Sequence, residues 1–380
     1  MKKIFVIAGE ASGDLHGSNL IKNLKTFSKE PLEIYGVGGD RIKNTGALEF
    51  FDLAHFHVTG MTEAIRRYPQ YKKAGKIILK KIEKTKPDLV VLIDNPGFNL
   101  FLAGKIHRLG IPSVYYIAPQ VWAWAPKRIL KIKRTIKKVL VVFEFEKKIY
   151  EDQGIPVAWV GHPLKDLIEQ NKDIKRVREK LVLGKSGPLI SLLPGSRKGE
   201  LKMLLSIFLK AGQVLLKKFP DAVFLLIKSP TLPKSFYERV LKKSPVPVSL
   251  VEEDAYSAIR SSDLAIVCSG TATLECSILG TPMVISNRGS LLTYIAAKSL
   301  IRVPYLGLPN ILLGKKRIPE LLQYDATPEK IAAAGTEILQ NESVRHTMKE
   351  DLKKASEKVG EGGANKKAAE EILKVLSGEN

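Results

Sequence analysis

The chain has 380 residues, of which 61 are Lys or Arg and 39 are Asp or Glu, so its formal net charge is +22. This length suffices for two domains that each bury a core, and a hydrophobic fraction of 44% excludes a generally disordered chain. The two cysteines, Cys268 and Cys276, exclude a disulfide-stabilised scaffold and a multi-cysteine zinc module.

Short β-branched runs alternate with helix-period segments along the chain, which is typical of α/β layers around parallel sheets. The expected strands are 3–8, 33–37, 89–94, 113–118, 139–143, 157–160, 189–193, 222–228, 248–251, 264–268 and 283–286. A charged segment at 171–187 separates the two halves, and the chain beyond about residue 328 is predicted to be helical. We therefore expect two domains, 1–175 and 176–380, that face a central cleft at the carboxyl ends of their strands.

The first strand runs into Gly9-Glu10-Ala11-Ser12-Gly13-Asp14, a turn with two glycines before a helix. Such a turn lets the backbone and the helix N-terminus approach a ligand. Ser12 or Asp14 could equally be the N-cap of the helix. The turn does not match G-x-G-x-x-G, so it is not a dinucleotide-binding fingerprint.

Two later loops in the first half carry candidate functional side chains. Asp94 ends a buried strand, where a carboxylate facing the cleft suits a general base, although Asp94 or Asn95 could simply cap the next helix. Trp122 and Trp124 lie in one strand-to-helix loop. They form either part of the core or an apolar wall for a sugar or acyl ligand.

Two segments of the first half are strongly basic. Residues 127–138 contain seven basic residues and no acid, and their isoleucines are spaced as on one face of a helix. Residues 72–86 also contain seven basic residues, with Glu83 as the only acid. These segments are either solvated helix faces or sites that bind an anionic membrane. Nucleic acid is the third alternative, but no recognised binding motif supports it.

In the second half, Arg197 follows a strand end and precedes a helix, where its guanidinium suits a phosphate. Ser269, Gly270 and Thr271 repeat this arrangement, and their backbone amides could hold a diphosphate. Glu275, one turn later, either interacts with the helix dipole or accepts ribose hydroxyls. Asn310 lies in a turn that could reach the cleft.

Motifs for metal, nucleotide-hydrolysis and hydrolase chemistry are missing from the sequence. It contains no D-x-D, no H-E-x-x-H, no P-loop and no G-x-S-x-G pattern. We therefore expect neither a metal site nor a cofactor.

Taken together and in this order, six motifs resemble those of the lipid-A-disaccharide synthase family, across roughly the first 310 residues. They are Gly9-Glu10-Ala11-Ser12-Gly13-Asp14, Ile93-Asp94-Asn95-Pro96-Gly97-Phe98-Asn99, Pro119-Gln120-Val121-Trp122-Ala123-Trp124, Leu192-Leu193-Pro194-Gly195-Ser196-Arg197, Ser269-Gly270-Thr271-Ala272-Thr273-Leu274-Glu275 and Leu308-Pro309-Asn310.

The resemblance implies a GT-B fold with two Rossmann-like domains, the first for catalysis and the acceptor and the second for UDP. It implies an inverting glycosyltransferase that joins UDP-2,3-diacylglucosamine to 2,3-diacylglucosamine 1-phosphate (lipid X). The products are the β-1,6-linked disaccharide 1-phosphate and UDP. It also implies a bacterial cytoplasmic enzyme on the cytoplasmic face of the inner membrane, bound through basic helices. The resemblance is compatible with a homo-oligomer, and it implies no nucleic-acid partner.

The resemblance also implies roles for matching residues. Asp94 would be the base, with Glu10 and Ser12 as further catalytic residues near the donor sugar or the acceptor. The implied substrate-binding residues are Asp14, Asn99, Trp122, Arg197, Ser269, Gly270, Thr271, Glu275 and Asn310. Gly97 is a departure, because members of the family carry an acidic residue at this position.

Two other functions fit some of these features. Another GT-B enzyme, either a non-hydrolysing UDP-GlcNAc 2-epimerase or a transferase to a different lipid, would share the fold and the nucleotide-binding turns. A basic nucleic-acid-binding protein would share only the charge.

Overall fold

A computed structural model describes residues 1–379 apart from 53–60, 170–185 and 290–302. Its described residues form two compact units. Unit 1 contains Met1–Asp166 and Val359–Asn380, and unit 2 contains Leu167–Ser299 and Val303–Lys358. Across the described ranges, no helix combines the length and the apolar composition that a membrane span requires.

Unit 1 is built on a seven-stranded parallel sheet with strand order β3-β2-β1-β4-β5-β6-β7. The strands are β1 (Lys2–Ala8), β2 (Leu32–Gly38), β3 (Leu48–Asp52), β4 (Leu89–Ile93), β5 (Ser113–Tyr116), β6 (Lys138–Val141) and β7 (Val157–Trp159). Strands β4 and β5 are buried at every position, as expected where helices cover both faces of a sheet.

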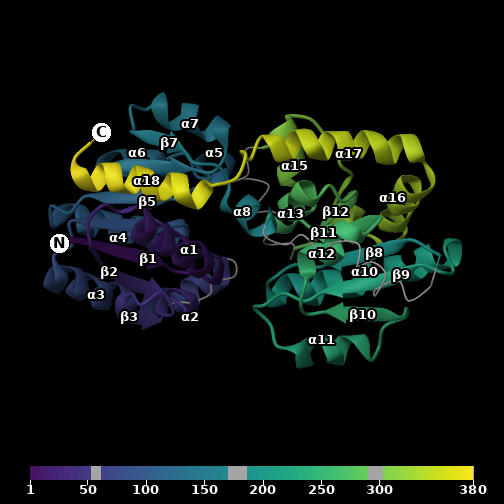
Figure 1. The fold of residues 1–380 in the computed structure, drawn as a ribbon. Coiled ribbons are helices and arrows are strands. Elements are labelled where there is room, and N and C mark those ends of the chain that lie inside the picture. The colour runs from purple at the N-terminus through teal and green to yellow at the C-terminus, as the bar shows by residue number, and fades with distance from the viewer. Residues whose placement is uncertain (53–60, 170–185, 290–302, 380) are drawn as a thin grey trace. The chain divides into compact units, whose positions relative to one another are not determined.

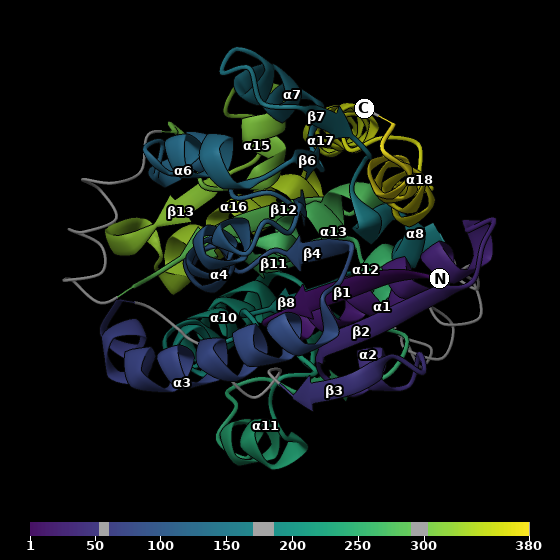
Figure 2. The ribbon, with the colours of Figure 1, turned by 90° about the vertical axis from the view of Figure 1, so that its left-hand side faces the viewer.

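The helices of unit 1 lie on both faces of this sheet (Figure 1). They are α1 (Ala11–Phe27), α2 (Asp40–Lys43), α3 (Met61–Thr85), α4 (Pro96–Arg108), α5 (Val121–Trp124), α6 (Arg128–Thr135), α7 (Glu144–Glu151) and α18 (Ala364–Ser377). Helix α8 (Pro163–Glu169) crosses from unit 1 into unit 2. Alternate residues of β1 enter different cores: Phe5 packs with α3, α4 and α6, and Ile4 with α1 and α18. Helix α4 contacts both α3 and α6 (Figure 2).

Unit 2 contains a six-stranded parallel sheet with strand order β10-β9-β8-β11-β12-β13. Its strands are β8 (Leu189–Leu193), β9 (Val223–Ile227), β10 (Val248–Val251), β11 (Leu264–Cys268), β12 (Met283–Asn287) and β13 (Glu320–Leu322). Its other elements are α10 (Lys198–Lys218), α11 (Lys234–Leu241), α12 (Ala255–Ser261), α13 (Thr271–Leu279), α15 (Leu308–Leu313), η1 (Gln323–Asp325), α16 (Pro328–Gln340) and α17 (Glu342–Glu357). The fold class predicted from the sequence, two parallel α/β sheets with a helical C-terminal region, is confirmed.

All the predicted strands are present, with small shifts at their ends, but the sequence pattern missed the edge strands β3 and β13. β3 has two acids among its five residues and β13 has only three residues, so neither shows the continuous apolar run that marks a central strand. The basic segment 127–138 is helical only over α6 and then enters β6. The turn predicted at Asn310 is instead the first turn of α15.

The final helix departs from the predicted division into domains. The expected boundary at residues 175 and 176 lies outside the described residues, but α18 belongs to unit 1 rather than with the second sheet. Its residues Ala368, Ala369 and Ile372 pack in the same core as α1, and α18 lies beside α1 (Figure 1). Helical periodicity shows that a helix has an apolar face but not which sheet covers it.

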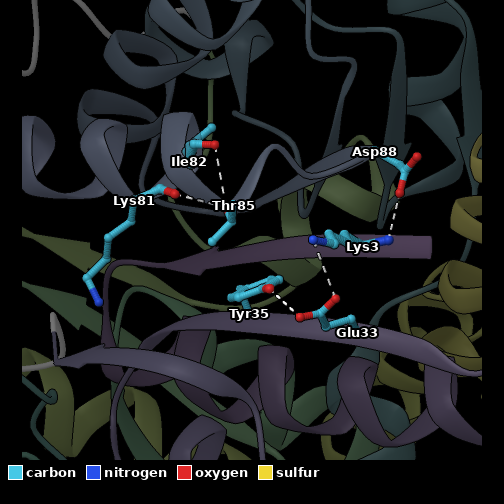
Figure 3. Close-up of polar contacts among 7 residues, drawn as sticks. All are labelled: Lys3, Glu33, Tyr35, Lys81, Ile82, Thr85 and Asp88. Carbon is cyan, nitrogen blue, oxygen red and sulfur yellow. Dashed lines mark hydrogen bonds and ion pairs between the residues drawn. The ribbon is translucent and has the colours of Figure 1, made fainter. Parts of the chain in front are cut away.

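Hydrogen bonds and an ion pair hold the amino-terminal end of the first sheet (Figure 3). The Lys3 backbone N–H donates to Asp88 Oδ2 at 2.7 Å, and Lys3 Nζ lies 3.7 Å from Glu33 Oε2. At the end of α3, the Thr85 hydroxyl donates to the Lys81 carbonyl at 2.9 Å. These groups are paired with one another, whereas open α/β sheets bind their ligands at the opposite, carboxyl-terminal edge.

Candidate active site

In each unit, the predicted functional residues follow strands that are parallel neighbours. The loops after β1, β4 and β5 therefore leave one edge of the first sheet, and those after β8 and β11 leave one edge of the second. Open α/β sheets bind ligands at this edge.

The first loop of unit 1 contains Glu10, which is the N-cap of α1. The alternative that Ser12 or Asp14 is the N-cap is therefore excluded. Ser12 is exposed and Glu10 is partly exposed.

Asp14 has a structural role in place of the predicted contact with substrate. It is buried, and its carboxylate accepts hydrogen bonds from the backbone N–H groups of Gly39 at 2.7 Å, Ile42 at 3.0 Å and Arg41 at 3.1 Å. These contacts tie the β2–α2 turn to α1. Three backbone donors thus hold the carboxylate in place.

The loops after β1 and β4 touch each other. A Cβ atom on Gly9 would lie 2.5 Å from Asn95 Nδ2, so a larger residue at this position would force the Asn95 side chain to shift. The structure thus brings the Gly9–Glu10 turn beside Asp94 and Asn95, as the sequence predicts for loops at one sheet edge.

Asp94 and Asn95 form an unusual turn at the end of β4. Both residues have left-handed backbone conformations, with φ angles of 48° and 42°. Asn95, not Asp94, is the N-cap of α4, and its side chain makes no capping hydrogen bond. The capping alternative therefore holds only for the position of Asn95, while Asp94 is a partly exposed residue at the end of the strand.

Asn99, predicted to contact substrate, holds this turn through hydrogen bonds to the backbone. The residue is fully buried, and its Nδ2 donates to the carbonyls of Ile93 at 2.9 Å and Asp94 at 2.8 Å. The Asp94 carbonyl also accepts a 2.6 Å hydrogen bond from the Tyr115 hydroxyl. No motif pointed to Tyr115, because within a strand it reads only as a core residue.

The loop after β5 is anchored by Trp122, which lies in α5. Its indole Nε1 donates to Glu146 Oε1 at 2.9 Å, and its ring meets Phe145 edge-on with centroids 5.0 Å apart. Glu146 is fully buried and also accepts a hydrogen bond from the Phe143 N–H at 3.1 Å. Burial raises the pKa of Glu146 to about 7. The side chain of Trp124 lies outside the described part of the structure.

In unit 2, Arg197 is exposed and is the N-cap of α10. Its guanidinium makes a 3.2 Å ion pair with Glu200 in the first turn of the same helix. Gly195 before it has a φ of 111°, a conformation that favours glycine. The turn therefore presents an exposed cation and a helix N-terminus, and both attract a phosphate.

The turn after β11 has a similar arrangement. Gly270 is the N-cap of α13 with a φ of 146°, and both Gly270 and Thr271 are exposed. The Ser269 hydroxyl donates to the Leu306 carbonyl at 2.9 Å, which fixes the turn. Glu275 follows one turn later, and burial raises the pKa of its carboxyl to about 7.

Asn310, predicted to line the cleft, is instead fully buried. Its Nδ2 donates to the Ile318 carbonyl at 2.9 Å and to Glu320 Oε1 at 2.7 Å. Its Oδ1 accepts from the N–H groups of Arg317 and Ile318 at 2.8 and 2.9 Å. Every hydrogen-bonding position of the amide is used, so Asn310 holds the segment between α15 and β13.

The described residues contain no group of three or more His, Cys, Asp or Glu side chains placed to hold a metal ion.

Comparisons with known proteins agree over nearly the whole chain. The family model "Lipid-A-disaccharide synthetase" matches residues 4–374. The lipid-A-disaccharide synthase of Syntrophus aciditrophicus is 38% identical over 377 residues, covering 99% of this chain and 98% of the relative. That of Neisseria meningitidis is 39% identical over 334 residues, covering 87% of each.

Solved structures share the fold at low identity. The structure of Staphylococcus aureus MnaA with UDP superposes with a TM-score of 0.71 at 14% identity, covering 99% of this chain and 97% of that one. The UDP-GlcNAc 2-epimerase of Neisseria meningitidis bound to UDP-GlcNAc gives 0.66 at 15% identity, covering 98% and 100%. At this identity the likeness establishes the architecture.

Proposed function

Because the chain belongs to the lipid-A-disaccharide synthase family, and is therefore a glycosyltransferase of lipid A biosynthesis, we propose that its donor is UDP-2,3-diacylglucosamine and its acceptor 2,3-diacylglucosamine 1-phosphate. The products are the β-1,6-linked disaccharide 1-phosphate and UDP. The observation that carries this proposal is the match of the family model over residues 4–374.

Asp94 is the proposed general base. Its carboxylate takes the proton of the acceptor 6-hydroxyl while the hydroxyl oxygen attacks C1 of the donor sugar. The bond from C1 to the UDP oxygen breaks in the same step, so the configuration at C1 inverts and UDP leaves with its electron pair. The partly exposed position of Asp94 at the end of β4 supports this role. Glu10 and Ser12, on the adjacent loop, are proposed to contact the sugars.

The second edge is proposed to hold the donor. The leaving diphosphate gains negative charge, and the Arg197 guanidinium together with the N-terminus of α13 at Ser269, Gly270 and Thr271 would stabilise it. Glu275 would bind the ribose, since a carboxyl with a pKa near 7 can either donate to or accept from a hydroxyl. The UDP in the MnaA structure supports nucleotide binding by this fold.

We further propose that unit 1 binds the anionic cytoplasmic face of the inner membrane. The exposed cations on and beside α3, α4 and α6 are Lys72, Lys73, Lys76, Lys80, Lys84, Lys86, Arg108, Lys127, Lys133, Arg134 and Lys137. Within 71–137 the only acids are Glu83, Asp88 and Asp94. Substrates with two acyl chains reside in a membrane, so this charge would bring the enzyme to them.

A turnover assay tests the reaction. Purified protein is incubated with UDP-2,3-diacylglucosamine, with and without 2,3-diacylglucosamine 1-phosphate and in the presence of EDTA, and the products are identified by mass spectrometry. We expect UDP and the tetraacyl disaccharide 1-phosphate only when the acceptor is present. Conversion of UDP-GlcNAc to UDP-ManNAc without an acceptor would instead identify a non-hydrolysing 2-epimerase.

Replacing the base tests the mechanism. Asp94→Asn keeps the size of the side chain but cannot accept the proton, so turnover should fall by about 10²- to 10⁴-fold. UDP affinity, measured by calorimetry, should stay at the wild-type value because the nucleotide contacts are on unit 2. Wild-type turnover by Asp94→Asn would eliminate Asp94 as the base.

A further inference from the structure

The turn after β4 stores backbone strain at the proposed base. Asp94 and Asn95 are consecutive non-glycine residues with positive φ, and Ile117, just beyond the neighbouring strand β5, has a φ of 56°. Left-handed backbone is costly for residues with a Cβ atom, above all for a β-branched one such as Ile117. Such conformations persist only where surrounding contacts hold them, and they gather at functional sites.

The contacts that hold Asp94 converge on its carbonyl oxygen. The Tyr115 hydroxyl donates to this oxygen at 2.6 Å and Asn99 Nδ2 at 2.8 Å, while the Asp94 N–H donates to the Tyr116 carbonyl at 3.1 Å. Two donors on one carbonyl fix the peptide plane between Asp94 and Asn95. Because that plane and the N–H are both fixed, the direction of the Asp94 Cα–Cβ bond is fixed as well.

Tyr115 is suited to hold this carbonyl rigidly. Its side chain is fully buried in the core that α3, α4 and α6 form with the sheet. Burial, aided by the nearby charge of Asp94, raises the pKa of Tyr115 well above its ordinary value, so the hydroxyl keeps its proton and remains a donor. A closely packed ring has little freedom to move its hydroxyl away.

We propose that Tyr115 is a positioning residue for the transferase reaction: its hydroxyl holds the strained Asp94 turn so that the carboxylate points at the acceptor hydroxyl. The inference rests on the proposed role of Asp94 as the base. The Tyr115 side chain is fully buried, so its proposed effect on the reaction is exerted through Asp94. Its removal should therefore lower kcat without changing either KM, since proton transfer depends steeply on the placement of the base.

The neighbouring residue is a matched control. Tyr116 is equally buried on the same strand, but its hydroxyl lies 3.3 Å from Asn365 Oδ1 in α18, away from the Asp94 turn. Tyr115→Phe and Tyr116→Phe each remove one buried hydroxyl and nothing else. We expect kcat to fall about tenfold in Tyr115→Phe, as for loss of a short hydrogen bond, and to stay at the wild-type value in Tyr116→Phe. Both KM values should be unchanged in each variant.

A double-mutant cycle separates positioning from general damage to the fold. In the Asp94→Asn background there is no base to position, so adding Tyr115→Phe should leave the residual rate unchanged. An equal loss in both backgrounds would overturn the inference, as would equal kcat values for Tyr115→Phe and Tyr116→Phe. Wild-type turnover by Asp94→Asn alone would instead refute the proposal that Asp94 is the base.

A second variant tests the same carbonyl if Tyr115→Phe fails to fold. Asn99→Asp replaces the donating amide by an acceptor, so the Asp94 carbonyl loses one of its two donors. An unchanged kcat in this variant would overturn the inference.

Discussion

At the scale of single residues, the polar side chains singled out in the motifs separate into two groups. Asp14, Asn99 and Asn310 are buried and hydrogen-bonded to the backbone of neighbouring loops, so they shape the two sheet edges. Arg197 and Thr271 are exposed at helix N-termini, where a ligand can reach them. A buried polar group must find a partner within the protein, whereas an exposed one is free to bind a ligand.

Arg197 should contribute directly to donor binding. In Arg197→Ala we expect the dissociation constant for UDP to rise about tenfold or more, because a charge-assisted hydrogen bond contributes about 1.5–3 kcal/mol. Glu200→Ala is the control: it removes the ion-pair partner of Arg197 but leaves the cation, so it should not weaken binding. Calorimetric titration with UDP measures both, and an unchanged affinity in Arg197→Ala would refute the diphosphate contact.

Gly97, where the chain departs from the family pattern, leaves room for a side chain. It lies exposed in the first turn of α4, and a Cβ added there would meet nothing within 4 Å. Gly97→Asp should raise the free energy of unfolding by about 1 kcal/mol, by restricting the unfolded chain and by placing a negative charge at a helix N-terminus. Urea unfolding measures the change, and Gly97→Ala separates the glycine effect from the charge.

The same variant also tests the base. If the double variant Asp94→Asn/Gly97→Asp turned over substrate faster than Asp94→Asn alone, the acid at position 97 would be able to act as the base. We expect no such rescue.

At the scale of elements, α18 shows how a distant segment completes unit 1. Its first residues are bound by Asp166 of α8, whose carboxylate accepts from the N–H groups of Asn365 and Ala364 at 3.1 and 3.2 Å. Nearby, the Lys165 ammonium donates to the Gly360 carbonyl at 2.6 Å. These contacts join the end of the segment Met1–Asp166 to the start of the segment Val359–Asn380, the two parts of the chain that form unit 1. The Asp166 carboxylate also satisfies N–H groups that a helix N-terminus leaves unpaired.

Removing this cap should destabilise the protein measurably. Asp166→Ala leaves two helix N–H groups without their carboxylate, so we expect a loss of about 1–2 kcal/mol in the free energy of unfolding. Glu370→Ala, an exposed acid on the same helix, is the matched control and should change stability little. Urea titration followed by circular dichroism compares the two, and equal stabilities would show that Asp166 does not cap α18 in solution.

At the scale of the whole molecule, the net charge of +22 is shared about equally by the two units, but individual helices differ in charge. The helices α3, α4 and α6 of unit 1 expose many cations and almost no acids, whereas α17 in unit 2 mixes Lys with Asp and Glu. An even spread of charge would favour non-specific attraction to any polyanion. A cation-rich layer on one unit favours an anionic surface such as a membrane.

Charge reversal tests this distribution. Replacing Lys133, Arg134 and Lys137 by Glu should weaken sedimentation with phosphatidylglycerol vesicles at least about a hundredfold, from about 1 kcal/mol for each cation lost. The same reversal at Lys349, Lys353 and Lys354 of α17 changes the net charge equally and should weaken binding much less. Equal losses in the two variants would mean that total charge, rather than this surface, sets the affinity.

The alternation of apolar strands and helical segments determined the fold class and the central strands, because the period of burial is a local property of the chain. The order and spacing of the loop motifs likewise determined the family. Tertiary structure alone decided that α18 joins the first sheet, that β3 and β13 are edge strands, and that Asp14, Asn99 and Asn310 are structural. It also revealed Tyr115 beneath Asp94. The reason is physical: burial and hydrogen-bond partners depend on residues far away in sequence, and no local pattern records which of them meet.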